Sequence, residues 1–177
     1  MVTTLRQPTV ATLGLGSVLD FFKAGALPVN TADLVDAVFG PAGDRGCLVI
    51  SGINGVVGAG KAVQLGSRLL PYGVRIVGLD FPGAADGLGQ QYQGLVASFG
   101  RAKADAVMAN IVRLTYDGKT LPAELESLKP RFLLEAIPEI LHVKKAHYAL
   151  FRQRFPDILI RSVTSGFPAK ELGVGVA

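Results

Sequence analysis

Cysteine is almost absent from this sequence, and tryptophan is missing altogether. The single cysteine, Cys47, excludes an intrachain disulfide and a zinc site built from several thiolates. It begins the short apolar run 47–50, where we expect a buried and unreactive thiol. One unpaired cysteine is typical of a protein in the reducing cytoplasm, which is therefore the predicted compartment.

Charged residues and long apolar runs are sparse as well. Only 18% of the residues are charged, and the net charge is +4. Because no basic stripe is interleaved with aromatic residues, nucleic acid is not an expected partner. No uninterrupted apolar run reaches the roughly 18 residues of a membrane span, so no membrane partner is expected either. The densest basic group falls on one predicted helix and is interpreted as a solvated face; it consists of Lys144, Lys145, Arg152 and Arg154.

Glycine and apolar residues dominate instead. The 177 residues include 22 glycines, and 49% of the chain is hydrophobic. Short apolar runs alternate with segments of helical periodicity, a pattern that indicates βαβ units and a mostly parallel sheet. An α/β fold is therefore predicted. The expected strands are 47–50, 74–79, 111–116, 131–137 and 158–163, and the expected helices are 59–70, 88–108, 121–128 and 138–155.

Residues 1–45 lack this alternation and are predicted to be an N-terminal extension of unknown role, preceding a main domain of residues 46–177. Within the extension, the segment 31–39 (TADLVDAVF) is predicted to form a short helix. Asn30 or Thr31 would cap its first turn, and the pair Gly40-Pro41 would end it.

A glycine-rich stretch, SGINGVVGAGKAV (residues 51–63), follows the first predicted strand and has two interpretations. In the first, Gly55, Gly60 and Lys61 belong to a phosphate-binding loop of nucleotide hydrolases. Such a loop also needs a serine or threonine hydroxyl to hold magnesium, and Ala62 occupies that position. Without the hydroxyl, triphosphate chemistry loses its main electrostatic support, so nucleotide hydrolysis is the weaker alternative.

In the second interpretation, the stretch is an extended form of the turn that binds dinucleotides. That turn follows a strand, opens a helix and is followed about 20 residues later by an acidic residue. Gly55 and Gly58 have the spacing of its second and third glycines, whereas Gly52 lies one position early, giving GxxGxxG instead of GxGxxG. Asp80 lies 22 residues after Gly58, at the end of the second predicted strand.

The second interpretation predicts NAD as the cofactor. Gly52 would permit the tight turn, Gly55 the approach of the backbone to the pyrophosphate, and Gly58 the close packing of helix on strand. Free amides at the helix N-terminus would bind the phosphates. Asp80 would bind the adenosine ribose and repel the additional phosphate of NADP, and no basic residue follows it before Arg101. The predicted cofactor contacts also include Asn54, Val56, Val57 and Phe81.

A GxxGxxG turn also occurs in extended short-chain dehydrogenases, but those enzymes need a Tyr-x-x-x-Lys pair. The tyrosines of this sequence are followed four residues later by Ile76, Val96, Thr120 and Arg152. The absence of a lysine at all four positions disfavours that family.

The second half of the sequence resembles 3-hydroxyacyl-CoA dehydrogenases over the stretch FLLEAIPEILHVKKAHYALFRQRFPDILIRSVTSGFP (residues 132–168). In that family the fourth strand ends in a Glu-Ala-x-x-Glu element, a lysine follows five residues later, and the fifth strand ends in Asn-Thr-Ser. The corresponding residues here are Glu135-Ala136-Ile137-Pro138-Glu139, then Lys144, then Val163-Thr164-Ser165. With the glycine turn and Asp80, the resemblance extends from residue 47 to about residue 172.

The resemblance implies a Rossmann-type, doubly wound domain that binds NAD in an oxidoreductase. Ala136, Glu139 and Lys144 would line the nicotinamide half of the cofactor. Ser165 would be the catalytic residue, hydrogen-bonding the substrate oxygen while a 3-hydroxyacyl thioester is oxidised to the 3-ketoacyl form. The implied partners are the acyl thioester, a helical C-terminal domain and, through that domain, a homodimer. Fatty acid metabolism is the implied process.

Several residues depart from the family. Ile140 and Val163 replace two asparagines, and the histidine that acts as general base beyond the fifth strand has no counterpart after His147. We therefore expect this chain to be the cofactor domain of a longer protein. The alternative is a noncatalytic nucleotide-binding or structural module. Taken singly, Lys144 also fits a solvated position and Ser165 a helix cap.

No metal site is expected. His142 and His147 lie five residues apart, which is the wrong spacing for one face of a helix. Both histidines are expected to be exposed or hydrogen-bonded to a partner.

Overall fold

The computed structural model describes residues 30–173. Most of the predicted N-terminal extension, residues 1–29, lies outside the described residues. The chain divides into two compact units, Met1–Leu34 and Val35–Ala177, and the second contains the sheet. The predicted division at residue 45 and the role of the extension stay predictions.

Helix α3, Thr31–Phe39, is the first described element and agrees with its prediction. The side chain of Asn30 accepts a hydrogen bond from the backbone N–H of Ala32 at 3.0 Å, which caps the first turn. Val35 and Phe39 are buried in the same hydrophobic cluster as Leu48 of the first strand. The core of the sheet therefore includes side chains upstream of residue 45.

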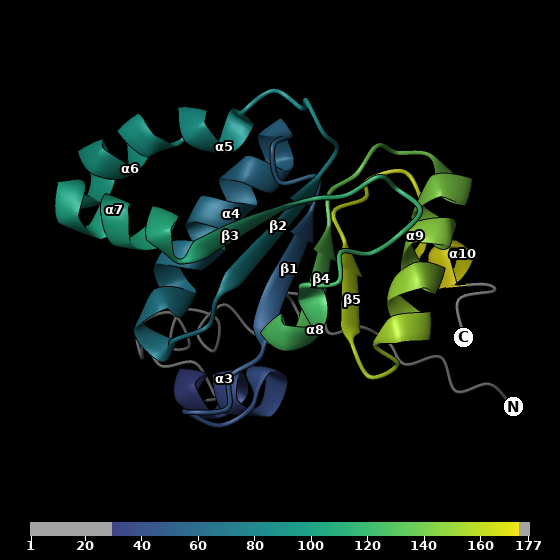
Figure 1. Ribbon diagram of the computed structural model, residues 1–177, viewed down its shortest axis with the longest axis horizontal. Helices are drawn as coiled ribbons and strands as arrows, with labels where there is room; N and C mark the ends of the chain where they lie inside the picture. The colour runs from purple at the N-terminus through teal and green to yellow at the C-terminus, as the bar shows by residue number, and fades with distance from the viewer. Residues whose placement is uncertain (1–29, 174–177) are drawn as a thin grey trace, which may run out of the picture. The chain divides into compact units, whose positions relative to one another are not determined.

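Five parallel strands form one sheet in the order β3-β2-β1-β4-β5 (Figure 1). The chain starts at the centre, winds to one edge, returns to the centre and winds to the other edge, which is the doubly wound arrangement of Rossmann folds. The predicted fold class is confirmed. The strands are β1 Cys47–Ser51, β2 Ile76–Asp80, β3 Ile111–Thr115, β4 Pro130–Glu135 and β5 Leu159–Ser162.

Helices cover both faces of the sheet because alternate side chains of each strand point to opposite faces. Leu48 and Ile50 of β1 face one cluster, which also holds residues of α4, α5, α6 and α7. Cys47 and Val49 face the other, with residues of α8, α9 and α10. The helices are α4 Val56–Leu69, α5 Gly87–Gln90, α6 Tyr92–Phe99, α7 Arg101–Ala109, α8 Leu125–Leu128, α9 Leu141–Arg154 and α10 Ala169–Gly173, with the 3-10 turn η1 Leu70–Tyr72 after α4.

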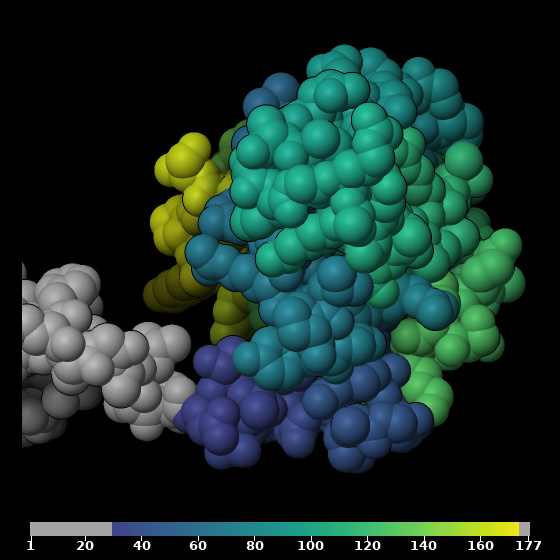
Figure 2. Space-filling model, turned by 90° about the vertical axis from the view of Figure 1, so that its left-hand side faces the viewer, coloured from purple at the N-terminus to yellow at the C-terminus, as the bar shows by residue number. Residues whose placement is uncertain are grey.

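Figure 2 shows α6 and α7, in teal, at the surface of the first of these faces. The single thiol lies on the other face: Cys47 is buried, and burial raises its pKa to about 12, as expected of an unreactive cysteine. Across residues 30–173, no helix combines the length and the apolar character that crossing a bilayer requires.

The predicted helices of the main domain differ from those observed: α4 begins at Val56 instead of residue 59, and only Leu125–Leu128 (α8) of the segment 121–128 is helical. The segment 88–108 is divided among α5, α6 and α7, and Gly100, with φ +80°, separates the last two. Helix α9 was expected from Pro138 but begins at Leu141. The carboxylate of Glu135 accepts a hydrogen bond from the N–H of Ile137 at 2.8 Å, which holds the chain in a turn after β4 and delays the helix.

The glycine turn between β1 and α4 brings backbone atoms too close together for side chains. Gly52 has φ +77°, and a Cβ there would lie 2.5 Å from the carbonyl oxygen of Ala136. A Cβ on Gly58 would lie 2.0 Å from the carbonyl oxygen of Gly52. The side chain of Ile53, in the same turn, is buried against Gly78 of β2. The longer GxxGxxG spacing is thus accommodated with Ile53 anchored in the core.

This crowding predicts opposite effects for two glycines of α4. Gly58→Ala should lower the free energy of unfolding by about 1–3 kcal/mol, because the turn must shift to admit the methyl group. Gly60→Ala is the matched control: nothing lies within 4 Å of a Cβ there, so the variant should gain up to about 1 kcal/mol from better helix propensity. Urea unfolding measures both, and equal effects would contradict the packing described.

Candidate functional site

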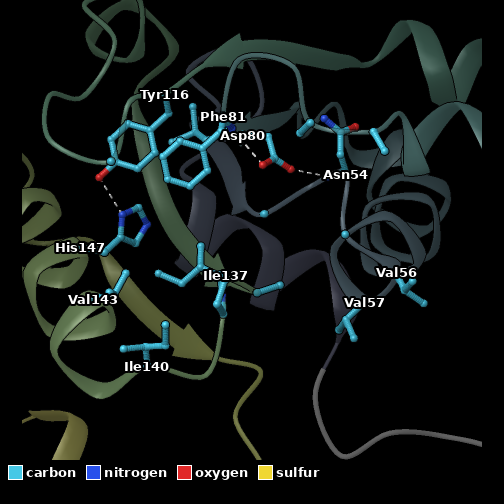
Figure 3. A pocket seen from close by; sticks show the side chains of 18 residues that line it. Asn54, Val56, Val57, Asp80, Phe81, Tyr116, Ile137, Ile140, Val143 and His147 are labelled. Carbon is cyan, nitrogen blue, oxygen red and sulfur yellow. Dashed lines mark hydrogen bonds between the residues drawn. The ribbon is translucent and has the colours of Figure 1, made fainter.

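A cavity of about 740 Å³ opens at the carboxyl ends of the strands (Figure 3). It lies where β1 and β4 are neighbours and the chain reverses its direction of winding, which is where open α/β sheets bind ligands. Its lining comes from the end of β2, from the turns after β1, β2, β3 and β4, and from α4 and α9. The lining residues are Gly52, Asn54, Gly55, Val56, Val57, Leu79, Asp80, Phe81, Ala84, Ala85, Tyr116, Gly118, Ala136, Ile137, Pro138, Ile140, Val143 and His147.

Most of the predicted cofactor contacts lie around this cavity. It is lined by Gly52, Asn54, Gly55, Val56, Val57, Asp80, Phe81 and Ala136. Four other predicted site residues are not part of its lining: Gly58, Glu139, Lys144 and Ser165. Gly58 acts through the turn described above, and Ser165 is exposed on the loop after β5. The binding and catalytic roles of all these residues stay predictions.

The carboxylate of Asp80 is fixed by two backbone amides at the end of β2. One oxygen accepts a hydrogen bond from the N–H of Asn54 at 2.8 Å, and the other from the N–H of Phe81 at 2.9 Å. Each carboxylate oxygen retains a lone pair for a further donor. Figure 3 shows the carboxylate between Phe81 and Asn54 at the cavity.

Asn54 lines the cavity and also carries an unpaired polar atom. Its side-chain oxygen is buried and has no hydrogen-bond partner among the described residues. Leaving a buried acceptor unpaired costs on the order of 1–3 kcal/mol, but this oxygen has almost no exposed surface, so a ligand could reach it only after the side chain moved. The hydroxyl groups of a ribose are donors of the kind that the free lone pairs of the Asp80 carboxylate can accept.

The first turn of α4 lies at the same cavity. Gly55 is the N-cap, no side chain caps the helix, and Val56 and Val57 line the cavity. The first amides of a helix have no partner within the helix and attract anions. The cavity therefore combines a site for a phosphate with acceptors for a sugar, so the residues present fit a dinucleotide.

The same helix removes the basis for a phosphate-binding loop. Because α4 begins at Val56, residues 56–61 are helical, and a loop with free amides around the lysine is not formed. Lys61 is not among the lining residues, and its ammonium donates to the side chain of Gln64 at 3.3 Å. Lys61 is therefore not placed to bind the β- and γ-phosphates of a nucleotide in this cavity.

The mouth of the cavity is apolar. Val56 at the N-terminus of α4 is 88% exposed, and Phe81, Ile140 and Val143 are also exposed although they are large and hydrophobic. Contiguous exposed apolar side chains around a cavity mark a surface that contacts a ligand or another protein. The cavity thus has a polar region at Asp80 and an apolar rim.

A buried histidine, which the sequence analysis did not assign to the site, forms part of the wall. His147 is 3% exposed; its Nε2 lies 2.8 Å from the hydroxyl of Ser51, and its Nδ1 lies 3.0 Å from that of Tyr116. Burial lowers the pKa of His147 to about 4, and burial raises the pKa of Tyr116 to about 12. Both groups are neutral at pH 7. The geometry is that of a serine paired with a base, but Ser51 is fully buried and no substrate can reach it.

The spacing of buried residues on α9 is the signal that could have identified this histidine. Lys144, His147, Tyr148 and Phe151 are the buried residues of the helix, at intervals of three and four. They form the face that packs on the sheet. His147 is hydrogen-bonded and His142 is exposed, in line with what was expected of the two histidines.

The burial of His147 predicts an acid-dependent loss of stability. The unfolded chain binds a proton near pH 6.5, whereas the folded protein does so only near pH 4, so stability falls as the pH drops through this window. The loss from this group is up to about 3 kcal/mol. His147→Gln should show a shallower pH dependence of urea unfolding between pH 7 and 4, whereas His142→Gln should retain the wild-type slope. Parallel slopes for wild type and His147→Gln would contradict this assignment.

Lys144 lies in a second buried network rather than on a solvated face, so that interpretation was wrong for this residue. Its side chain is fully buried, and its ammonium lies 2.7 Å from Glu135 and 3.1 Å from Glu139. The carboxylate of Glu135, also fully buried, accepts further hydrogen bonds from Tyr148 and Ser162. Every charge in the network has a partner, which buried ions require.

Glu139 joins this network to the loop that carries Ser165. Its carboxylate accepts hydrogen bonds from the hydroxyl of Thr164 and, at 3.0 Å, from the N–H of Gly166. The hydrogen bond from Thr164, followed by that from Lys144, lowers the pKa of the Glu139 carboxyl. Glu139 thus holds the loop after β5 against the start of α9.

Breaking the ion pair should be costly. Lys144→Met leaves the buried carboxylate of Glu135 without its cation and should lower the free energy of unfolding by about 3–5 kcal/mol. Lys145→Met, at the adjacent and partly exposed position, should change it by less than about 0.5 kcal/mol. Adding Glu135→Gln to Lys144→Met should restore part of the loss, because the uncompensated charge is removed. Urea unfolding of the four proteins tests this, and equal stability of the two lysine variants would refute it.

Metal-ligand chemistry is not apparent in this part of the chain. Over residues 30–173, no group of three or more histidine, cysteine, aspartate or glutamate side chains is placed to hold a metal ion.

Comparison with known proteins adds information on the fold. No protein-family model and no curated protein matches the sequence. Among solved structures, the chain is similar to the crystal structure of M. tuberculosis FadB2, with a TM-score of 0.56 and 18% sequence identity. The match covers 71% of this chain and 43% of the FadB2 chain, so this chain spans less than half the length of that neighbour. At this identity the similarity shows a shared Rossmann-like α/β fold.

Proposed function

We propose that this chain is the NAD-binding domain of an oxidoreductase that oxidises a 3-hydroxyacyl thioester. One observation carries the proposal: the fixed carboxylate of Asp80 and the uncapped N-terminus of α4 converge on one cavity. These are acceptors for ribose hydroxyls and donors for a diphosphate, in the relative order that a dinucleotide presents them. The class of substrate rests on the resemblance of residues 132–168 to 3-hydroxyacyl-CoA dehydrogenases.

The proposal assigns the diphosphate to the amides around Gly55 and the adenosine ribose to Asp80. The nicotinamide half would then extend past Ala136, on the β4 side of the cavity. NAD, when bound, supplies the hydride acceptor. The residues of this chain orient it, and the apolar rim of the cavity excludes water from it.

Glu139, Lys144 and Ser165 have a modified role in this proposal. Because Glu139 is held between Lys144 and Thr164, it positions the loop on which Ser165 is exposed. Ser165 would hydrogen-bond the substrate oxygen from that loop. The acyl thioester, a helical domain that completes the site and a homodimer formed through it remain the proposed partners.

A noncatalytic nucleotide-binding module is the second candidate. It is favoured by the state of His147, the histidine that lines the cavity: both ring nitrogens are occupied by Ser51 and Tyr116, and the ring is neutral. A histidine bonded in this way is not free to accept a proton from substrate. Binding and chemistry must therefore be tested separately.

Titration with NADH, NADPH and magnesium ATP tests the binding proposal. NADH should bind more tightly than NADPH, and Asp80→Asn should weaken NADH binding about tenfold or more, because it replaces a charged acceptor with a neutral one of the same shape. The control is Asp157→Asn. Asp157 is exposed and precedes the edge strand β5, on the other side of the sheet from Asp80, so this variant should bind NADH as the wild type does. Tight binding of magnesium ATP without binding of NADH would overturn the proposal.

Turnover separates the two candidates. Reduction of acetoacetyl-CoA by NADH, measured as the loss of NADH absorbance, would support the oxidoreductase. The other outcome is that NADH binds without turnover even when the helical C-terminal domain of a 3-hydroxyacyl-CoA dehydrogenase is added. That result would support the noncatalytic module.

A further inference from the structure

The Ser51–His147–Tyr116 hydrogen-bond chain has one more polar hydrogen than it has hydrogen bonds. The serine hydroxyl, the neutral imidazole and the phenol each carry one polar hydrogen, and the chain has two hydrogen bonds. Neither hydroxyl has another hydrogen-bond partner within residues 30–173. One hydrogen is therefore left over, and it must lie at one end of the chain.

Two arrangements satisfy both contacts. In the first, Tyr116 donates to Nδ1 of His147, Nε2–H donates to Ser51, and the hydroxyl hydrogen of Ser51 is left over. In the second, Ser51 donates to Nε2, Nδ1–H donates to the oxygen of Tyr116, and the phenol hydrogen is left over. The arrangements differ in which ring nitrogen carries the hydrogen and in which end of the chain remains a free donor.

Burial decides between these arrangements. Ser51 is 0% exposed and does not line the cavity, so a free hydroxyl hydrogen there would be a buried, unsatisfied donor. Tyr116 is 6% exposed and lines the cavity, so its hydroxyl is the nearer of the two to water or a ligand. Because an unsatisfied buried donor is costly, the second arrangement is favoured. The ring of His147 stays neutral at pH 7, so it carries a single hydrogen and cannot donate at both ends.

We propose that Tyr116 is a hydrogen-bond donor of the cavity, held in that role by His147 and Ser51, and that it recognises a neutral acceptor atom on a planar group of the ligand. The surroundings define that group. Phe81, whose ring is stacked on Tyr116 with centroids 6.4 Å apart, is half exposed and offers a flat apolar surface. Val143 lies beside His147 in the lining of the cavity (Figure 3), where a charged acceptor would be poorly solvated.

The identity of the ligand rests on the proposed function. If the ligand is NAD, the planar group that Tyr116 recognises is the adenine base. Phe81 follows β2 and Tyr116 follows β3, on the side of the cavity where Asp80 places the adenosine ribose. The ring nitrogens of adenine are neutral acceptors on a planar ring. Tyr116 thus becomes a specificity-determining residue for the base of the cofactor.

The tautomer of His147 tests the hydrogen-bond chain without any ligand. The protein has two histidines, so the variant His142→Gln leaves one imidazole, that of His147, to observe. Long-range ¹H–¹⁵N correlation spectra at pH 7 should show the hydrogen on Nδ1 and an unprotonated Nε2. A hydrogen on Nε2 would place the free donor at Ser51 and overturn the proposal.

Binding of NADH tests the role of the donor. Tyr116→Phe retains the ring but removes the hydroxyl, and should weaken NADH binding about five- to tenfold. Tyr92→Phe is the matched control, because Tyr92 lies on α6, donates to Asp105 and is not part of the cavity lining. Its affinity should equal that of wild type. Unchanged affinity of a folded Tyr116→Phe variant would overturn the proposal.

The two readouts separate this inference from the proposed function. If the wild-type protein bound no NADH, the proposed function would fail, and with it the assignment of adenine to Tyr116. The Nδ1 tautomer would still establish Tyr116 as the donor of the chain. If NADH bound but the tautomer were Nε2–H, the proposed function would stand and the present inference would fall.

Discussion

The close approach of Gly58 to the carbonyl of Gly52 is the constraint on which the rest of the cavity depends. With no side chain between them, α4 begins directly beyond the end of β1, and its free amides reach the crevice between β1 and β4. Ile53 fixes the same turn by packing in the core against Gly78 of β2. The turn also orients the N–H of Asn54 toward Asp80, so the glycines position the polar end of the site as well as the helix.

The inner face of α9 carries two polar networks with different properties. Around Glu135 and Lys144 each donor and acceptor is matched, and the network links β4, β5 and the loop after β5. Around His147 one hydrogen remains unmatched. A complete network stabilises the fold, whereas an incomplete one next to a cavity offers a specific contact to whatever enters it.

In the proposed function, binding and chemistry would belong to separate parts of the domain. The groups that fit a dinucleotide lie on β1, β2 and α4, close to one another in the fold. Ser165 lies apart from them on an exposed loop, and its position depends on Glu139 rather than on the cavity wall. Under that proposal the domain would hold the nucleotide, and the reaction would depend on groups brought to its rim, where Val56, Phe81 and Ile140 present an apolar surface.

The sequence by itself determined the strands, the glycine turn and the position of Asp80, because these depend on local hydrophobic runs and on backbone geometry within a few residues. It also determined helix α3, whose cap at Asn30 is a local signal. It did not determine the start of α9, which a carboxylate from β4 delays, or the burial of Lys144, whose partners lie on other elements.

The tertiary structure alone decided the environment of His147. Ser51, Tyr116 and His147 are far apart in the sequence and meet only because the carboxyl ends of β1 and β3 lie close to α9 in the fold. Hydrogen bonding and burial depend on which side chains surround a group, and that is fixed by packing between distant segments. Local pattern therefore predicts where a polar residue lies along a helix, but only the assembled core determines its charge and its partners.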